Sequence, residues 1–459
     1  MRATATRLTI GSLRELATVG VVSALSAAYG AALMTASDML SVYAVHKGGS
    51  PGRLLDVVAD VFILIALFVS GIVISNGVGT VIAGRRNRLR LLRLVGATSA
   101  QLRASITRAV VLVAALGAVG GAVLGTIGGD ITRIILVHNG TLAHGGYRML
   151  PPGVLVAVAA VVVTGAIAAR AGTRATLAGF AAAPVLGRVG AGRRVFAVVA
   201  ALAGGALLAL AAVLGEHGNL IGFVVAFLGA ATVSVGALVG AQLIVPTLVR
   251  LGGRLLGGSA ASAVARKNAV GDPHRTTRSV LGLLIGVTLV TTIASGMTSV
   301  SRSVDEWDLT PANAAATRET LAVMTAILLA VVAISVVVSA VGFVSTMSLT
   351  VIGRTAEIGM LRTMGFTARQ VRSMIFRESL AMSGTAVATG LLLGILFGTL
   401  GSQSLVGALT SGVPIGLPWP ALVAIVVGTV GLALVAALPP SRRAVAVSPV
   451  EALRIGAQR

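Results

Sequence analysis

The sequence contains no cysteine, and this absence excludes several kinds of chemistry. Disulfide bonds, thiol nucleophiles and cysteine-ligated zinc are not available to the chain. Aromatic residues make up only 3% and charged residues only 11% of the 459 positions, whereas 56% are hydrophobic and the mean hydropathy is +0.98. So much apolar surface exceeds what one water-soluble core can cover, so a lipid bilayer must solvate the remainder.

Acidic residues are also scarce, with 14 against 36 Lys and Arg, and the formal net charge is +22. A basic excess of this size suggests nucleic-acid binding. The arginines, however, lie between apolar runs rather than on one continuous face, and we predict no nucleic-acid partner. Lysine occurs only at Lys47 and Lys267, and this Arg-, Ala-, Gly- and Val-rich composition is typical of a GC-rich bacterial genome.

Long apolar runs divide the chain into membrane spans. A span needs about 20 apolar residues, because the hydrocarbon core is roughly 30 Å thick and a helix rises about 1.5 Å per residue. The first run follows Arg2, Arg7 and Arg14 as in a secretory signal, but its length and the later runs favour an uncleaved helix. The sequence predicts ten spans, at residues 16–34, 57–82, 109–127, 154–169, 195–214, 220–245, 280–298, 320–344, 379–400 and 421–438.

The distribution of charge predicts the orientation of these spans. If the N-terminus is cytoplasmic, 30 of the 36 Lys and Arg residues lie in cytoplasmic segments. Nine of the 14 acidic residues then lie outside or at the outer boundary. Because basic residues are retained in the cytoplasm, we expect a multi-pass cell-membrane protein with both termini cytoplasmic.

The sequence repeats itself at a shift of 269 residues. The match runs without a gap from a basic loop into the following helix, which composition alone does not readily explain. A looser similarity joins residues 183–186 to the tail at 448–454. The matched pairs include Gly84 and Gly353, Arg85 and Arg354, Arg93 and Arg362, Gly96 and Gly365, Thr98 and Thr367, Gln101 and Gln370, Gly121 and Gly390, Gly125 and Gly394, and Gly129 and Gly398.

This repeat defines the expected architecture. We predict an all-α integral membrane protein of two four-helix repeats joined by a two-helix connector. The first repeat covers residues 1–190, the connector 191–250 and the second repeat 251–459. Both copies have the same orientation, because Arg93 and Arg362 lie on one side, so the repeat is parallel rather than inverted.

A short amphipathic segment precedes the third helix of the second copy. Ile358 and Leu361 fall on one helical stripe. Arg354, Glu357 and Arg362 flank that stripe. The pattern predicts a short helix at the cytoplasmic interface, although a solvated basic loop that only maintains topology would have similar periodicity.

The residues after this segment can end one helix and begin the next. Met364 and Phe366 could extend the apolar stripe. Gly365 tolerates the left-handed conformation of a helix C-cap, and Thr367 can cap the helix that follows. We therefore expect a tight turn at 365–367.

This loop resembles that of the FtsX-like permease family of ABC transporters, which typically reads Arg-x-x-Glu-Ile-Gly-x-Leu-Arg-Ala-x-Gly with a later Glu. Residues 265–275 and the ending at 449–454 are similar to further segments of that family. The resemblance is strong over most of 260–459 and weak over 1–190. The matching positions are Arg354, Glu357, Ile358, Gly359, Leu361, Arg362, Gly365 and Glu378, with Thr363 where Ala is usual.

The resemblance implies that the short helix is a coupling helix, which docks into a groove on a separate cytoplasmic ABC ATPase. ATP and magnesium would bind to that partner, and this chain would be a non-catalytic permease without a cofactor. Two copies in one chain imply two ATPase subunits per permease. The corresponding candidates in the first copy are Arg93 and Gly96.

The first copy departs from the family pattern. Arg88, Leu89 and Arg90 replace the Glu-Ile-Gly triplet, and Ala109 replaces the later Glu. This loop carries seven arginines and no acid. It could dock more weakly, dock differently, or chiefly contact anionic lipid head groups.

Other candidate sites have weaker support. Neither lysine completes a Gly-x-x-x-x-Gly-Lys phosphate-binding loop, and the predicted spans carry no mid-span His, Asp or Glu that would favour a secondary transporter. The histidines lack the spacing and acidic partners of a metal site.

The small-residue ladders are interpreted as helix-packing faces rather than substrate contacts, with members at Gly121, Gly125, Gly390, Gly394 and Gly398.

The function expected from the sequence is export or extraction of an amphipathic drug, peptide or lipid. The outer loops at 35–56 and 299–319 are too short to hold a folded domain. The alternative is a mechanotransmitting or sensing complex that regulates an extracytoplasmic partner and transports nothing.

Overall fold

The computed structural model describes residues 13–46, 94–139, 150–178, 191–254, 273–307, 309–319, 355–410, 412–413 and 415–446, and scattered positions within 61–91 and 321–344. All regular secondary structure in these parts of the chain is helical. The elements are α2 (Leu13–His46), α5 (Ser99–His138), α6 (Pro152–Ala178), α7 (Ala191–Glu216), α8 (Ile221–Arg254), α10 (Pro273–Ser303), η1 (Val304–Glu306), α12 (Thr355–Thr363), α13 (Ala368–Val406), η2 (Gly407–Leu409) and α14 (Trp419–Ala446).

The long helices correspond to the predicted membrane spans. Within the described residues, α2, α5, α7, α8, α10 and α13 are each long and apolar enough to cross a membrane. α6 and α14 contain shorter apolar stretches, Pro152–Ile167 and Trp419–Val435. The predicted spans at 57–82 and 320–344 lie largely outside the described residues. The all-α membrane class is confirmed, and the ten-span repeat stays a prediction.

α5 is longer than the span predicted at 109–127. Its 40 residues correspond to about 60 Å of helix, twice the roughly 30 Å of hydrocarbon. Its exposed apolar face continues from Leu112 to Ile135, so the predicted end of the span is too early. Asp130 and Arg133, which lie past that end, form a 3.1 Å ion pair on a sheltered side of the helix.

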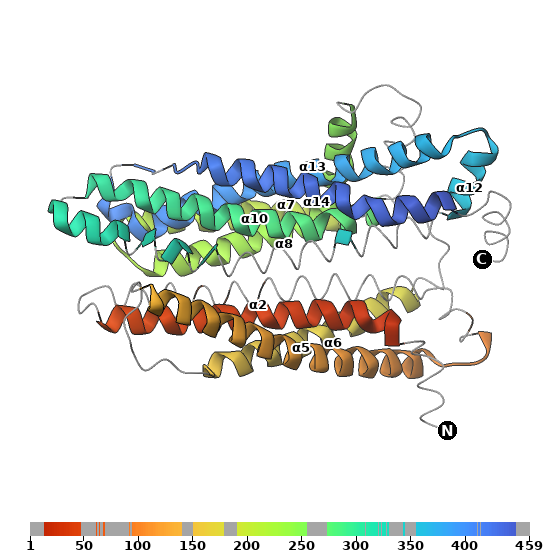
Figure 1. The fold of residues 1–459 in the computed structure, drawn as a ribbon, viewed down its shortest axis with the longest axis horizontal. Helices are drawn as coiled ribbons and strands as arrows, with labels where there is room; N and C mark the ends of the chain where they lie inside the picture. Colours follow the sequence, from red (N-terminus) through yellow and green to blue (C-terminus); the bar gives the residue numbers. More distant parts are fainter. Residues whose placement is uncertain are drawn as a thin grey trace.

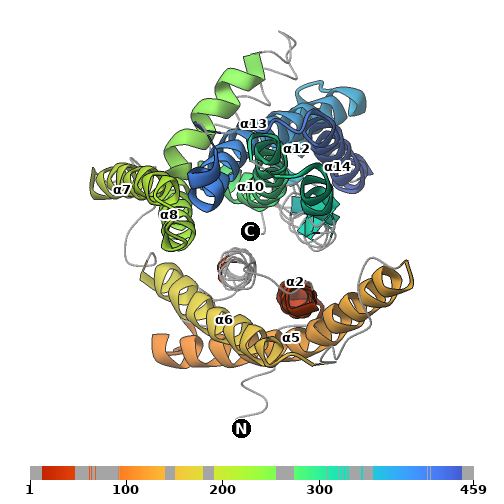
Figure 2. The same cartoon turned by 90° about the vertical axis from the view of Figure 1, so that its left-hand side faces the viewer.

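Most helices run roughly along the long axis of the molecule and form two groups that lie side by side (Figures 1 and 2). α2, α5 and α6 pack together, and α7, α8, α10, α13 and α14 form the second group. The short helix α12 lies at one end of the second group, where α13 begins and α14 ends (Figure 1). We refer to this end of the molecule as the α12 end.

Glycines hold the first and third helices of each predicted copy in close contact. On α5, a methyl group added at Gly121 or Gly125 would lie 1.8 Å or 2.3 Å from the carbonyl oxygens of Ala24 and Ala28 on α2. On α13, Gly394 and Gly398 lie against α10 in the same manner, and a methyl at Gly398 would lie 2.6 Å from the Thr292 carbonyl oxygen. The contacts advance in the same direction along both helices, so each pair runs parallel.

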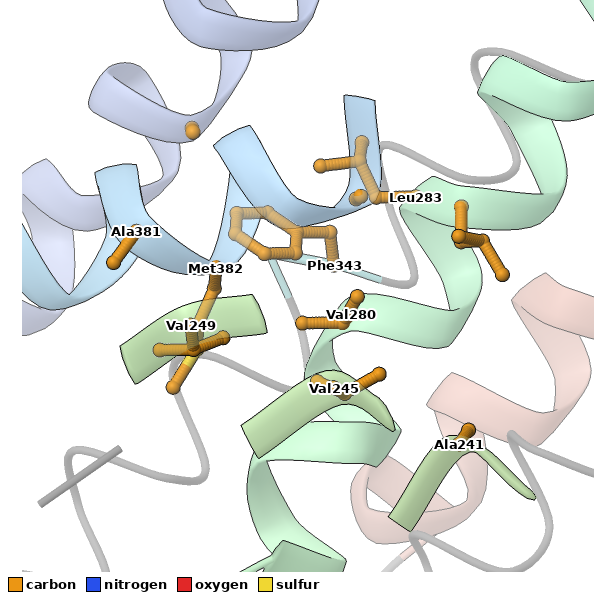
Figure 3. Packing of buried hydrophobic residues seen from close by; sticks show 11 residues of the cluster. Ala241, Val245, Val249, Val280, Leu283, Phe343, Ala381 and Met382 are labelled. Atoms are coloured by element: carbon orange, nitrogen blue, oxygen red, sulfur yellow. The ribbon is translucent and has the colours of Figure 1, made fainter. Parts of the chain in front are cut away.

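A hydrophobic cluster joins α8, α10 and α13 in the second group (Figure 3). Val280 of α10 and Met382 of α13 are fully buried beside Val249 of α8. Phe343 fills the same cluster, so the end of the predicted span at 320–344 lies next to these three helices. The cluster places the last helix of the connector inside the second group.

The predicted connector corresponds to the α7–α8 pair. Gly204 of α7 and Gly229 of α8 lie at the contact between the two helices. Leu208 of α7 packs with Phe397 of α13, so the pair covers one face of α13. The Phe227 ring of α8 also meets the Phe68 ring edge to face, with centroids 6.4 Å apart.

Candidate docking site at the α12 end

α12 ends in a hydrogen-bonded turn that requires glycine. Gly365 has a φ of 98°, in the left-handed region that side chains disfavour. The Gly365 N–H donates to the Arg362 carbonyl (3.1 Å), and the Phe366 N–H donates to the Leu361 carbonyl (3.0 Å). These two bonds define a Schellman motif, and the C-cap expected at Gly365 is confirmed.

α13 begins two residues later with a reciprocal capping box. The Gln370 N–H donates to the Thr367 hydroxyl (3.3 Å), and the Thr367 N–H donates to the Gln370 side-chain oxygen (2.8 Å). Two donors that the helix leaves unpaired are thereby satisfied. Because both helix ends are capped, the angle between α12 and α13 is set by local hydrogen bonds.

The first copy has the same local geometry 269 residues earlier. Gly96 has a φ of 98°, as Gly365 does. Thr98 and Gln101 form the capping box of α5 at 3.3 Å and 3.1 Å. The divergent sequence of the first loop therefore retains the turn that precedes the third helix.

The apolar stripe recognised in the sequence faces the protein itself. Ile358 is only 3% exposed and packs with Met374 and Ile375 of α13 and Ala437 of α14. Leu361 is partly buried against the same cluster. These side chains anchor α12 to the bundle, so the face available to a partner lies elsewhere on the helix.

The outward side of α12 and its terminal turn carry two apolar residues, one of which, Met364, is expected from the sequence to extend the buried stripe. Met360 is 51% exposed and Met364 is 63% exposed, one helical turn apart. Glu357 and Thr363 are exposed beside them. Met360 was not picked out by the sequence pattern, because spacing alone does not tell which side of a short amphipathic helix meets the bundle.

Apolar side chains are exposed at the corresponding positions of the first copy. Leu91 is 62% and Val95 is 87% exposed, and they correspond to Met360 and Met364 at the 269-residue shift. Leu94 is exposed between them. We call these two sets the paired apolar tips, comprising Met360 and Met364 in one copy and Leu91, Leu94 and Val95 in the other.

The remaining predicted site residues occupy distinct positions. Arg354 and Arg93 lie outside the described residues. Glu357 lies in the first turn of α12 and Arg362 in its last turn, the arrangement that complements the helix dipole. Gly359 is buried, and Gly365 and Gly96 are exposed in their turns.

Ionisable groups near this end include one buried acid. Glu378 of α13 is 2% exposed, and it engages in interactions with its neighbours. Arg369 and Arg372 on the first turns of α13 are exposed. No group of three or more potential metal ligands occurs among the described residues.

Parallel helices of membrane-spanning length, with a short capped helix at one end, define the class of multi-pass helical membrane proteins. The comparison with known families agrees: a model described as "FtsX-like permease C-terminal" matches residues 61–177 and 329–449, just over half of the chain. The chain belongs to the FtsX-like permease family. The model matches twice, once on each side of the α7–α8 pair.

Two curated relatives are similar to part of the chain. The lipoprotein-releasing system transmembrane protein LolC of Haemophilus influenzae is 32% identical over 126 residues, which are 27% of this chain and 32% of the relative. An uncharacterized ABC transporter permease of Bacillus subtilis, YknZ, is 30% identical over 133 residues, 29% of this chain and 32% of the relative. The matches span about a third of the length of each relative.

Proposed function

We propose that this chain is the membrane-spanning permease subunit of an ABC transporter and that its paired apolar tips dock on cytoplasmic ATPase subunits. The observation that carries the proposal is the exposure of apolar side chains at matching positions of both copies, each before a positive-φ glycine. Exposed apolar residues on a rigid support are typical of a protein interface. Family membership and the two ABC-related relatives support the same assignment.

The proposed coupling follows from how α12 is attached. Ile358 anchors α12 to α13 and α14, and the Schellman turn and capping box fix its angle to α13. α13 in turn packs on α10 through Gly394 and Gly398. A displacement of α12 by a closing ATPase would therefore be transmitted along two packed helices rather than absorbed in a loop.

The first copy is included in this proposal as a second docking point. Its tip retains the glycine turn, the capping box and exposed Leu91, Leu94 and Val95. Contact with anionic head groups would need the arginines of the loop but not these apolar side chains. Two tips on one permease would engage two ATPase subunits.

The orientation and substrate are proposed on separate grounds. The Lys and Arg distribution supports a cytoplasmic position for the α12 end. The substrate class is an amphipathic drug, peptide or lipid, which a path between apolar helices could accommodate. The competing function is a sensing or mechanotransmitting complex that acts on an extracytoplasmic partner.

The test first looks for a gene next to that of this chain that encodes an ATPase with a phosphate-binding loop, and then measures co-purification of that ATPase with the permease. Replacing Met360 and Met364 by Asp should weaken binding at least about tenfold, since losing an apolar interface anchor costs more than about 1 kcal/mol. Replacing both by Leu should retain binding, because volume and polarity are kept. If the Asp variant and the wild-type permease recover equal amounts of the ATPase, docking through this tip is refuted.

The same experiment on Leu91 and Val95 decides whether the first tip docks. Loss of half of the bound ATPase would indicate one subunit per tip, whereas unchanged binding with altered lipid dependence would support the head-group alternative.

Transport is tested in vesicles: a compound that stimulates ATP hydrolysis without crossing the membrane would favour the sensing function.

A further inference from the structure

The segment that joins α13 to α14 has an unusual composition for a connection outside the membrane. No charged residue or histidine occurs between Glu378 and Arg442, and this stretch includes the loop at 407–418. Connections that face water normally carry polar or charged side chains. In the first copy, the corresponding connection carries His144 and Arg148.

Large apolar side chains of this loop and of the residue that follows it face outward. Leu409, Val413, Ile415 and Trp419 are each at least 48% exposed. They lie at the end of the bundle opposite α12, where α13 ends and α14 begins. We call these four residues the loop patch. Exposure of four large apolar groups to water would be unfavourable, so the patch needs an apolar neighbour.

The backbone of the loop reaches back along α10 to the depth of its hydrophobic span. Gly416 is buried against α10, and a methyl group there would lie 2.3 Å from the Ser299 backbone nitrogen. Ser295 and Ser299 fall on either side of residue 298, where the sequence predicts the span to end. Both also lie within the apolar stretch Val280–Glu306. The loop therefore returns to the level of the leaflet opposite α12.

α10 supplies hydrogen bonds to the loop backbone at this depth. The Ser295 hydroxyl donates to the Gly416 carbonyl (2.9 Å), and the Gly416 N–H donates to the Ser299 hydroxyl (2.8 Å). The Arg302 guanidinium donates to the Ile415 carbonyl (3.1 Å). Irregular backbone is tolerated inside a bilayer only where such groups are satisfied by protein. A loop in water would not need side-chain partners for consecutive backbone groups.

The loop patch is also continuous with a lipid-facing helix surface. Trp419 begins α14, and Val423 and Val427 are exposed on the same helix at four-residue intervals from it. Tryptophan at the end of a span is typical of the membrane interface. A protein partner in water would usually add polar rim residues, and the sequence from 379 to 441 supplies no charge.

We infer that the loop at 407–418 is immersed in the leaflet opposite α12 and that the loop patch is a lipid-binding surface for acyl chains. Ser295, Ser299 and Arg302 attach this surface to α10. α10 packs on α13, so a movement of these helices would carry the lipid-contacting loop with it. The inference rests on membrane residence and does not require the proposed ATPase coupling.

Tryptophan fluorescence tests the inference, because the chain has only two tryptophans. The Trp307→Phe variant leaves Trp419 as the only emitter, and the Trp419→Phe variant leaves Trp307, which follows the exposed Asp305 and Glu306. Both are reconstituted in vesicles of phosphatidylcholine brominated at defined acyl positions. Trp419 should lose roughly half of its emission to bromines at acyl positions near the head group, as expected of a tryptophan at the membrane interface. Trp307 should lose markedly less of its emission.

Cysteine labelling supplies an independent measurement without background, since the chain has no native cysteine. Ile415→Cys and Val413→Cys are compared with Asn313→Cys, an exposed position beyond the apolar stretch Val280–Glu306. In nanodiscs, a water-soluble maleimide should label the two loop variants about tenfold more slowly, because the reactive thiolate is disfavoured in lipid. After transfer to denaturing detergent, the three rates should converge.

Each alternative outcome overturns the inference. Trp419 quenched by aqueous acrylamide but not by bromolipid would place the loop in water, and so would equal labelling rates in nanodiscs. Protection from both quenchers would indicate a protein neighbour instead of lipid.

Discussion

Substitution of adjacent glycines on α5 should have opposite effects on stability. Gly121 faces α2, and a methyl group there would lie 1.8 Å from the Ala24 carbonyl oxygen and 2.7 Å from the Ala24 Cα. Gly120, one residue earlier, has nothing within 4 Å of the added methyl. The pair differs in side-chain surroundings and in little else, so each glycine controls for the helix propensity of the other.

The magnitude follows from these distances. A carbon–oxygen contact needs about 3.3 Å, so Gly121→Ala must separate the two helices by about 1.5 Å. Overpacking of this kind costs about 1–3 kcal/mol, and the upper part applies because the obstructing atoms are backbone. Gly120→Ala should be neutral or stabilising by up to about 1 kcal/mol, from helix propensity alone.

The assay is thermal survival in detergent, read as the temperature at which half of the protein remains monodisperse. Gly121→Ala should lower it by several degrees, and Gly120→Ala should leave it unchanged or raise it. Gly390→Ala in the second copy should fall between them, because its nearest obstructions are side-chain atoms of Val287 at 2.7 Å and 2.9 Å. If Gly121→Ala and Gly120→Ala behave alike, the tight α2–α5 contact is wrong.

Two further substitutions test the turn and the loop. Gly365→Ala should cost about 1–2 kcal/mol of backbone strain, although nothing lies within 4 Å of the added methyl group. The variant should insert into the membrane normally but stimulate the partner ATPase less than the wild type does. Unchanged stimulation would show that the angle of this turn is unimportant for coupling. Ser299→Ala should destabilise the protein by about 1–3 kcal/mol, because the Gly416 N–H loses its 2.8 Å hydrogen-bond partner. The control is Ser301→Ala on the exposed side of α10, which should not change the thermal survival measured in the same assay.

The two copies differ most where the α7–α8 pair is present. On α13, Leu400 and Phe397 pack against this pair, and Gln403 is fully buried and donates to Glu216 at 3.3 Å. The α5 positions equivalent to Leu400 and Gln403 are Ile131 and Ile134, which are exposed. A buried amide needs protein partners, whereas isoleucine suits lipid. The α7–α8 pair thus explains why α13 carries a glutamine at position 403 whereas α5 carries an isoleucine at the equivalent position 134.

The sequence by itself determined the membrane class, most span positions and the capped turn at Gly365. These follow from local physics: apolar length, the left-handed tolerance of glycine and the reach of a Thr–Gln capping box depend on neighbours in the chain. The same locality explains why the first copy forms the same turn although the residues before it differ.

Only the tertiary structure decided which faces of the helices are used. Periodicity places Ile358 on an apolar stripe, but its burial against Ala437 depends on where α14 ends, 79 residues further along the chain. The exposure of Met360 and the hydrogen bonding of Gly416 to α10 likewise depend on segments far apart in sequence. A pattern of apolar residues shows that a face is buried in something, and packing shows whether that is the protein, the lipid or a partner.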